Sequence, residues 1–203
     1  MTDLLLKGAN LLGEKGADVL VRNGVIAEIG SIPAAPEHGG RRLSVVDAGG
    51  LVLLPGLVDL HTHLREPGRE DAETVASGSA AAAVGGFTAI LAMANTSPVT
   101  DTAEAAERVF DLGREVGLVD VQPIGAVSKA LAGAELAELG LMARSRARVR
   151  VFSDDGKCVH DPVLMRRALE YTKAYDGVVA QHAQEPRLTE GSQMHEGVVS
   201  AQI

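Results

Sequence analysis

Residues 53–70 read LLPGLVDLHTHLREPGRE, and this stretch gives the first indication of the fold. Its first part, LLPGLVDL at 53–60, is a continuous apolar run of the kind that forms a strand buried on both faces. The polar residues that follow it indicate a loop. From residue 53 onward, apolar runs of this kind alternate with helical patterns, so the sequence predicts a parallel sheet wrapped by helices.

Five strands and four helices are expected in this alternating part. We place the strands at 53–60, 87–94, 119–127, 148–152 and 177–183, and the helices at 72–84, 102–116, 134–145 and 161–175. A complete eight-stranded barrel takes about 250 residues, whereas the whole chain has 203. The spacing alone therefore leaves two folds open, a shorter open α/β sheet and a barrel cut partway round.

The residues before this part indicate a separate β module at 1–53. Short apolar runs separated by glycine-rich turns occupy 3–10, 17–30 and 42–56. Inside the second run, Asn23 and Gly24 form the strongest short hairpin signal. We therefore expect two domains, the β module at 1–53 and an α/β domain at 54–203.

The composition excludes several classes of function. The formal net charge is -8 and only 2% of the residues are aromatic, so the chain lacks the basic surface or stacking side chains of a nucleic-acid binder. The longest apolar stretch, 51–60, is too short to cross a bilayer, and the N-terminus does not resemble a signal peptide. Cys158 is the sole cysteine and cannot form an internal disulfide. We expect a cytoplasmic protein with no nucleic-acid or membrane partner.

His61 and His63 stand directly after the first strand of the α/β part. Side chains at positions i and i+2 of extended chain point to the same face, which places two imidazoles where they can share one metal ion. A bare pair of this kind is more often found in an exposed loop. Here the pair follows a buried strand, at the end where barrel enzymes keep their active sites, and this favours a metal site.

Two further strand ends carry candidate ligands. Asp154 and Asp155 follow the strand at 148–152, although Asp-Asp-Gly is also good turn chemistry. His182 lies near the end of the strand at 177–183, where a lone histidine is more often a buried structural residue. Taken together, imidazole and carboxylate groups at one edge of a parallel sheet suit zinc, as one ion or as two ions bridged by a carboxylate.

Arg65 and Asn95 occupy the same edge, after the first two strands of this part. An arginine can hold a carboxylate through two hydrogen bonds, and an asparagine side chain both donates and accepts. Each residue alone could equally be part of an exposed loop or turn. An arginine that shares a loop with two candidate zinc ligands indicates a small anionic substrate.

Several motifs carry a family resemblance. PGLVDLHTHLREPG at 55–68 resembles the signature of the amidohydrolase superfamily, and its REPG ending resembles the dihydroorotases of the long bacterial class. FTAILAMANTSPVTD at 87–101, VFSDDG at 151–156 and VVAQHAQEP at 178–186 are similar to that family in order and spacing. MHEG at 194–197 is a weaker match. The resemblance covers essentially the whole chain, including the β module.

This resemblance implies a (β/α)8 barrel of the TIM type, incomplete in this chain, which holds about five βα units. Residues 54–203 would be the N-terminal part of a metal-dependent hydrolase barrel. The positions that match metal ligands are His61, His63, Asp155 and His182. Asp154 then becomes a neighbouring loop residue. A sixth-strand histidine and an eighth-strand aspartate that acts as general base are expected beyond Ile203, so no general base is expected within this chain.

The activity implied by the resemblance is zinc-dependent, reversible hydrolysis of dihydroorotate to N-carbamoyl-L-aspartate in pyrimidine biosynthesis. Arg65 and Asn95, with His63 nearby, match positions that bind the substrate carboxylate. The implied partners are the small anionic substrate, further copies of the chain in a homo-oligomer, and aspartate transcarbamoylase. The remainder of the barrel is expected as a second fragment or a missing segment.

Two alternatives stay open at this point. A hydantoinase or allantoinase would share the fold, but many such relatives use a carboxylated lysine where this sequence has Asp155. A non-catalytic, dihydroorotase-like scaffold for aspartate transcarbamoylase is the other alternative. Such scaffolds typically lose metal ligands, whereas the four candidate ligands are all present here.

Overall fold

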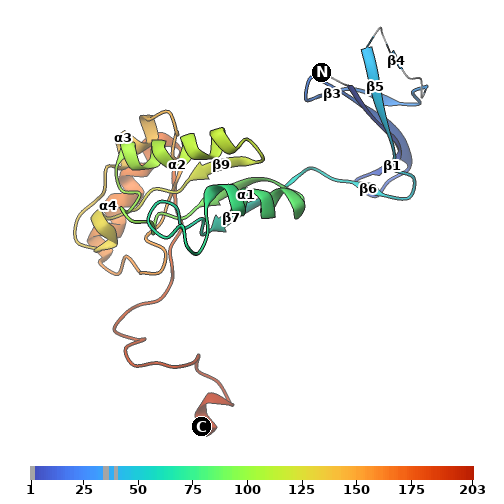
Figure 1. Ribbon diagram of the computed structural model, residues 1–203. Helices are drawn as coiled ribbons and strands as arrows, with labels where there is room; N and C mark the ends of the chain where they lie inside the picture. The colour runs from blue at the N-terminus through green and yellow to red at the C-terminus, as the bar shows by residue number, and fades with distance from the viewer. Residues whose placement is uncertain (1–2, 34–36, 39–40) are drawn as a thin grey trace. The chain divides into compact units, whose positions relative to one another are not determined.

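The computed structural model describes residues 3–33, 37–38 and 41–203. The chain divides into two compact units, Met1–Pro55 and Gly56–Ile203 (Figure 1). The boundary expected after residue 53 lies within two residues of this division. None of the helices in the described part of the chain is both long enough and apolar enough to cross a bilayer.

The unit Met1–Pro55 is built on one mixed sheet. Its strands are β1 (Asp3–Leu11), β2 (Gly16–Arg22), β3 (Val25–Gly30), β4 (Glu37–His38), β5 (Arg41–Asp47) and β6 (Val52–Leu53). Their order is β3-β2-β1-β5-β4, with β6 also paired to β1. The predicted hairpin is confirmed, because Arg22 pairs with Val25 across Asn23 and Gly24. Their φ angles of 50° and 78° are the positive values that a tight two-residue hairpin turn needs.

One buried carboxylate ties this sheet together. Asp18 accepts hydrogen bonds from Lys7 Nζ at 2.5 Å, from the Gly8 amide at 2.9 Å and from the Ile32 amide at 2.8 Å. These donors, the Lys7 ammonium first among them, lower the pKa of Asp18 from 3.8 to about 2. Beside this cluster, a small apolar core forms from Leu5, Leu20, Ile32 and Leu43.

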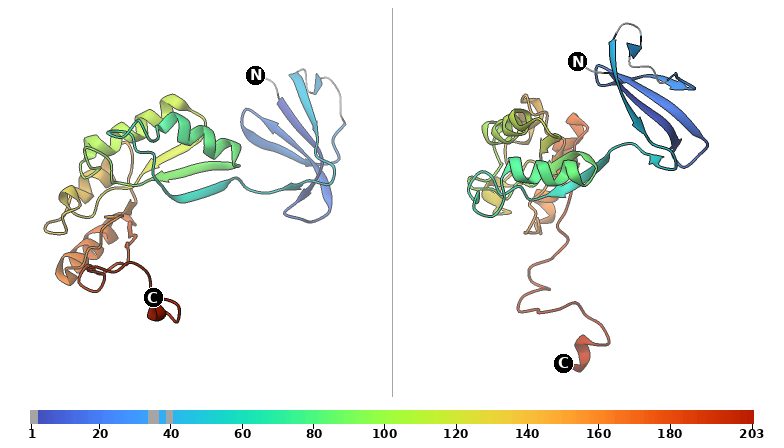
Figure 2. Two further views of the ribbon diagram at one scale, coloured as in Figure 1. Left: turned by 60° about the horizontal axis from the view of Figure 1, so that its bottom comes forward. Right: turned by 45° about the vertical axis from the view of Figure 1, so that its right-hand side comes forward.

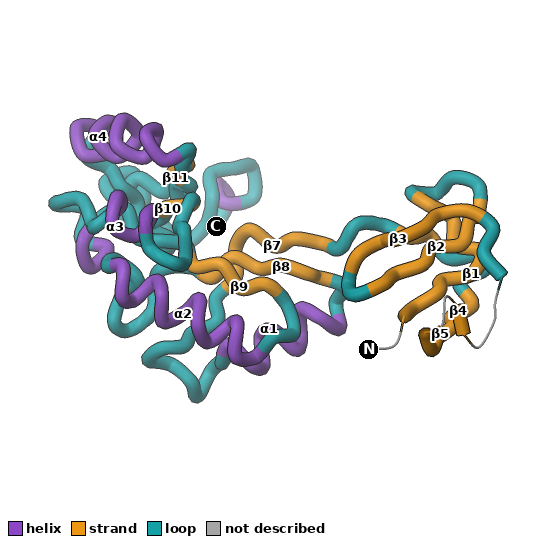
Figure 3. The backbone as a smooth tube through the Cα atoms, turned by 90° about the horizontal axis from the view of Figure 1, so that it is seen from above, coloured by secondary structure: helices purple, strands orange, loops and turns teal. Residues whose placement is uncertain are grey.

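The unit Gly56–Ile203 alternates strands with helices, as the sequence predicts. Its elements are β7 (Leu57–Thr62), α1 (Val75–Val84), β8 (Phe87–Ala92), α2 (Ala103–Val116), β9 (Asp120–Pro123), a 3-10 turn at Lys129–Leu131, α3 (Leu139–Arg144), β10 (Val151–Phe152), α4 (Pro162–Thr172), a 3-10 turn at Lys173–Tyr175, β11 (Val178–Val179) and a 3-10 turn at Ser200–Gln202. Strands β7, β8 and β9 form one parallel sheet, visible as adjacent tubes in Figure 3, and β10 pairs with β11 in parallel.

The two parallel groups of strands are connected through one bridge. Gly125, just after β9, pairs in parallel with Phe152 of β10. The Gly125 amide donates to the Val151 carbonyl at 3.1 Å, and the Ser153 amide donates to the Gly125 carbonyl at 2.9 Å. Neighbouring strands from β7 to β11 therefore run in one direction, and the loops that follow them lie at the same edge of the sheet.

Packing in this unit depends on close approach between helices and strands. A Cβ atom at Gly113 of α2 would lie 2.4 Å from Cβ of Val121 in β9, so only glycine lets the helix lie this near the sheet. Around Phe152, which is fully buried, α3 and α4 contribute Met142, Leu164 and Ala168 to the largest apolar cluster. After β11 the chain leaves these layers as turns and irregular segments (Figure 2).

Several expected elements differ from the structure. The strand predicted at 53–60 is divided, because Val52–Leu53 pairs with β1 and only Leu57–Thr62 belongs to the parallel sheet. Pro55 has no amide proton to donate, which explains the break. The helix predicted at 134–145 is helical only over Leu139–Arg144. The first part of the predicted helix is not helical, and its Leu136 instead forms an isolated antiparallel β-bridge with Ser128.

Candidate metal centre

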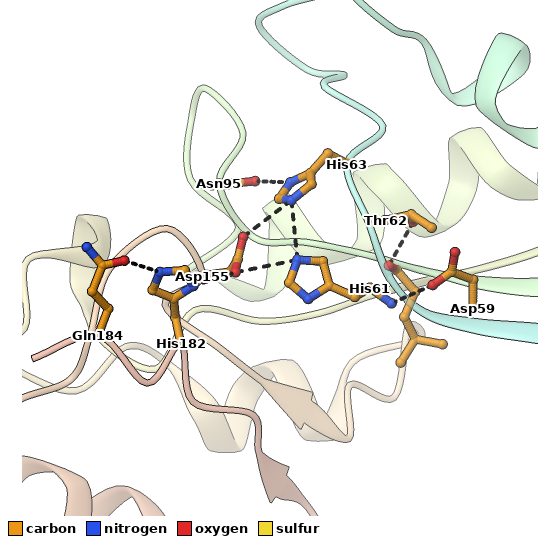
Figure 4. Close-up of polar contacts among 9 residues, drawn as sticks. Asp59, His61, Thr62, His63, Asn95, Asp155, His182 and Gln184 are labelled. Atoms are coloured by element: carbon orange, nitrogen blue, oxygen red, sulfur yellow. Dashed lines mark hydrogen bonds and ion pairs between the residues drawn. The ribbon is translucent and has the colours of Figure 1, made fainter. Parts of the chain in front are cut away.

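Two histidines at the end of β7 begin the site. His61 is the fifth residue of the strand, rather than the first of a loop, and His63 follows one residue beyond it. Their Nε2 atoms lie 3.3 Å apart, and Figure 4 shows both rings turned toward Asp155. Between them, the Thr62 hydroxyl donates to the Leu91 carbonyl oxygen at 2.8 Å, which fixes this strand end against β8.

Asp155, in the loop after β10, lies at the middle of the cluster. Its Oδ1 is 3.4 Å from Nε2 of His61 and 3.4 Å from Nδ1 of His182, and its Oδ2 is 3.4 Å from Nε2 of His63. The Asp155 side chain is only 8% exposed. The structure therefore brings the four predicted ligands together from three strand ends.

His182 reaches this centre because β11 pairs with β10. The Ala180 amide donates to the Phe152 carbonyl oxygen at 2.9 Å, which continues the ladder one step past β11. Asp155 lies three residues after Phe152, and His182 lies two residues after Ala180. The segments that follow β10 and β11 consequently leave the sheet side by side, and they place the side chains of Asp155 and His182 at the same edge.

These four side chains form a ligand set suited to a metal ion. Each imidazole directs one nitrogen toward the Asp155 carboxylate, and His61, His63 and Asp155 offer ligand atoms that all lie within 4.8 Å of one another. Neutral imidazole nitrogens and carboxylate oxygens are ligands that divalent transition metals accept. The chemistry of the residues present therefore fits a metal centre.

Asp154 has a different environment from its neighbour. Its Oδ1 accepts from the amides of Val127 at 2.7 Å and Ser128 at 3.0 Å, and its Oδ2 accepts from the Ser128 hydroxyl. Asp154 is 2% exposed. Because donors of the protein already occupy both oxygens, Asp154 anchors the loop after β9 and is placed away from the three histidines.

The two candidate substrate residues lie on the loops that follow β7 and β8. Asn95 Oδ1 is 3.0 Å from Nδ1 of His63, and its amide nitrogen is not used in that contact. Arg65 has a φ of 60°, a left-handed conformation that bulky residues rarely adopt. Arg65 is half-buried as a residue, and within the described residues its guanidinium makes no hydrogen bond or ion pair, so it is available to an anion.

A direct backbone contact joins these two loops. The Ser97 amide donates to the Pro67 carbonyl oxygen at 2.9 Å. Gly68 makes the approach possible, because its φ is 107° and a Cβ there would lie 2.5 Å from the Ser97 carbonyl oxygen. Arg65 and Asn95 are therefore carried on one connected rim beside the histidines.

Sequence reasoning did not single out Gln184. Its Oε1 lies 3.1 Å from Nε2 of His182, the ring nitrogen on the far side from Asp155 (Figure 4). The only signal in the sequence is the spacing of two residues from His182, which is too common to be informative. The anchoring role of Asp154 was also missed, since Asp-Asp-Gly indicates a turn without saying which carboxylate is used internally.

The model of the family described as Dihydro-orotase-like matches residues 50–202. The chain belongs to this family. Among curated relatives, the dihydroorotase of Streptomyces coelicolor is 62% identical over 203 residues, which cover all of this chain and 46% of that protein. The dihydroorotase of Leifsonia xyli is 60% identical over 199 residues, which cover 98% of this chain and 44% of that protein.

This dihydroorotase-like chain thus spans less than half the length of those relatives. Solved structures with the same fold include the L-hydantoinase of Arthrobacter aurescens, with a TM-score of 0.75 and 23% identity over 94% of this chain and 43% of that one. The dihydropyrimidinase of Brevibacillus agri has a TM-score of 0.70 and 23% identity over 91% of this chain and 40% of that one. At this level of identity the structural likeness establishes the fold alone.

Proposed function

We propose that this chain forms the N-terminal part of a zinc-dependent dihydroorotase, which reversibly hydrolyses dihydroorotate to N-carbamoyl-L-aspartate. The observation that carries the proposal is the buried Asp155 carboxylate with a ring nitrogen of each of three histidines at 3.4 Å. The high identity to curated dihydroorotases supports the choice of substrate.

The proposal extends to the architecture. We assign residues 1–53 to an N-terminal β module and 54–203 to the first part of a (β/α)8 barrel, whose remaining strands come from elsewhere in the complete gene product. Barrel enzymes place their catalytic groups on the loops after the strands. We assign the general base to the part of the barrel outside this chain.

His61, His63, Asp155 and His182 would hold one or two zinc ions. Zinc supplies Lewis acidity to the ring carbonyl and lowers the pKa of a water molecule toward about 7. The chain's own contribution is to bring these ligands together from three strand ends and to keep the Asp155 oxygens buried. The anchoring of the neighbouring Asp154 by Ser128 holds this loop in place.

Arg65 and Asn95 would orient the substrate through its free carboxylate. The Arg65 guanidinium, which has no partner among the residues that the structure describes, can donate two hydrogen bonds to a carboxylate, and the Asn95 amide nitrogen can add another. Because the two loops are joined through Ser97 and Pro67, both donors keep a constant position relative to His63. A substrate carboxylate held in this way would orient the substrate with its ring amide near the metal centre, so that binding also supplies the orientation for reaction.

The test uses the Arg65→Ala variant of the complete gene product that includes this chain. We expect kcat/KM for dihydroorotate to fall roughly 100-fold, since a charge-assisted pair contributes about 1.5–3 kcal/mol, while the zinc content stays at the wild-type level. The matched control is Arg69→Ala, because Arg69 lies in the same loop but pairs with Asp71 at 3.6 Å. Loss of zinc in Arg65→Ala, or equal loss of activity in both variants, would contradict the assignment.

A hydantoinase is the second candidate, supported by the shared fold with an L-hydantoinase. Measuring the complete gene product with dihydroorotate, hydantoin and allantoin separates the two candidates directly. A preference for hydantoin or allantoin by more than tenfold in kcat/KM would overturn the dihydroorotase proposal. A protein without tightly bound metal would instead indicate a scaffold.

The remaining parts of the proposal concern the setting of the enzyme. We place it in the cytoplasm as a homo-oligomer, with association to aspartate transcarbamoylase as a further possibility to be tested. Light scattering of the purified gene product, alone and after mixing with the transcarbamoylase, measures both associations. A monomer that stays separate would remove both partners from the proposal.

A further inference from the structure

In each of the three histidines of the centre, one ring nitrogen faces away from Asp155. The three residues differ in the hydrogen-bond partner of that nitrogen. For His63 that nitrogen is Nδ1, which lies 3.0 Å from Oδ1 of Asn95. For His182 it is Nε2, which lies 3.1 Å from Oε1 of Gln184. For His61 it is Nδ1, and the described residues provide it with no hydrogen bond. Two of the three rings are therefore held by side-chain amides.

An amide oxygen can only accept a hydrogen bond, so the ring nitrogen opposite it must carry the proton. A neutral imidazole has one proton, and its other nitrogen then has a free lone pair. In His63 the free lone pair is on Nε2, and in His182 it is on Nδ1. These are the two nitrogens that face the Asp155 carboxylate. Each amide contact thus selects the tautomer that can bind a metal.

The chain builds the Gln184 contact locally. The backbone amide of Gln184 donates to the His182 carbonyl oxygen at 2.8 Å, which closes a tight three-residue turn from His182 to Gln184. This turn directs the Gln184 side chain back to the ring two positions earlier. Figure 4 shows the amide group at the side of the ring opposite Asp155.

We infer that Gln184 and Asn95 are positioning residues, which set the tautomers of His182 and His63 so that Nδ1 of the first and Nε2 of the second are presented to the metal. The inference rests on the proposed metal centre. Partners of this kind typically change metal affinity by roughly 10–100-fold when they are removed. For His182 the selected Nε2–H tautomer is already the usual one, so Gln184 acts mainly by fixing the orientation of the ring, and its side chain has no proposed contact with substrate.

The primary experiment measures zinc affinity by competition with a chromophoric chelator, using the complete gene product. We expect Gln184→Ala to lower the affinity by roughly 10–100-fold. Gln184→Glu should restore it to within a few-fold of wild type, because a carboxylate oxygen accepts the same proton. The matched control is Gln193→Ala, since Gln193 is also exposed and lies in the same terminal segment. Wild-type affinity in Gln184→Ala would overturn the inference.

A second measurement reads the tautomers without metal and without activity. In the metal-free protein labelled with ¹⁵N-histidine, above about pH 8 where imidazoles are neutral, long-range ¹H–¹⁵N spectra report which nitrogen is protonated. We expect the proton on Nδ1 in His63, the minor form of free histidine, and on Nε2 in His182. Asn95→Ala should move the His63 proton to Nε2 and leave His61 unchanged, whereas Asn95→Asp should keep it on Nδ1.

The two measurements separate failure of the inference from failure of the proposed function. A His63 ring protonated on Nε2 in the wild type would overturn the positioning role, even if zinc binds tightly. Correct tautomers in a protein that binds no zinc would support the positioning role and overturn the zinc-dependent function.

Discussion

Asp18 in the N-terminal unit and Asp155 in the second unit are buried to the same extent, each 7% exposed, yet their neighbours are opposite in kind. Asp18 is surrounded by donors, namely the Lys7 ammonium and two backbone amides at 2.5–2.9 Å. Asp155 is surrounded by three imidazole nitrogens at 3.4 Å. In two of these imidazoles the other ring nitrogen lies within hydrogen-bonding distance of a side-chain amide oxygen, that of Asn95 or Gln184.

The comparison shows how similar burial serves different ends. Removing a carboxylate from water is costly unless it is hydrogen-bonded or paired. For Asp18 the fold itself supplies the compensation, which makes the residue structural. For Asp155 the fold supplies three imidazole nitrogens at 3.4 Å instead, an arrangement that suits a bound cation. A buried carboxylate without fixed donors is therefore the stronger indicator of function.

Among the variants that test this difference between Asp18 and Asp155, we expect the largest effect for Asp155→Asn. Loss of the central carboxylate should lower zinc affinity by about 1,000-fold, in line with the roughly 3–5 kcal/mol for breaking a buried charge pair. The thermal stability of the metal-free protein should not fall, because no donor of the fold depends on Asp155 and the variant removes a buried charge. Metal analysis and calorimetry measure the two quantities. Unchanged zinc content would break the contrast between the two carboxylates.

A smaller effect is expected for Asp154→Ala, which tests whether the contrast holds between adjacent residues. Asp154 resembles Asp18, since its oxygens accept from two amides and the Ser128 hydroxyl. We expect the free energy of unfolding to fall by about 2–3 kcal/mol, because buried donors lose their acceptor. Urea titration of the metal-free protein checks this value. Equal stability to wild type would show that the donors find other acceptors.

The smallest effect concerns the pH dependence of the N-terminal unit. The pKa of Asp18 is lowered from 3.8 to about 2 in the folded protein, so its ionised form stabilises the fold above about pH 4. This contribution is lost as the pH falls from about 4 to 2. We expect Asp18→Asn to destabilise the unit at pH 7 and to reduce its sensitivity in that window. Circular dichroism during acid titration measures both. Unfolding curves of the same shape for the two proteins would contradict the stabilising role of ionised Asp18.

Much of the fold followed from pattern. The hairpin at Asn23 and Gly24 is local, because positive φ at two adjacent positions is a property of those residues themselves. The alternation of strands and helices in the second unit is likewise periodic. The division of the predicted 53–60 strand was not foreseen, since it depends on β6 pairing with β1, some forty residues earlier. A pairing between distant residues leaves no mark on the apolar pattern.

The candidate site shows the same limit. Histidines and aspartates at strand ends indicate a metal centre because their chemistry is specific, and the structure places the four predicted ligands around one point. Which of Asp154 and Asp155 faces the histidines depends on where Val127 and Ser128 present their amides. Gln184 could not be anticipated, because an exposed glutamine has no distinctive pattern and its contact depends on a turn of the backbone.

The contact between Ser97 and Pro67 has a consequence for protein engineering. Because Gly68 brings the two loops into direct backbone contact, lengthening either one would displace its neighbour. A designer who wishes to redirect this scaffold to another ligand should therefore graft the segments 63–70 and 95–101 as a matched pair, and keep glycine at the point where they meet.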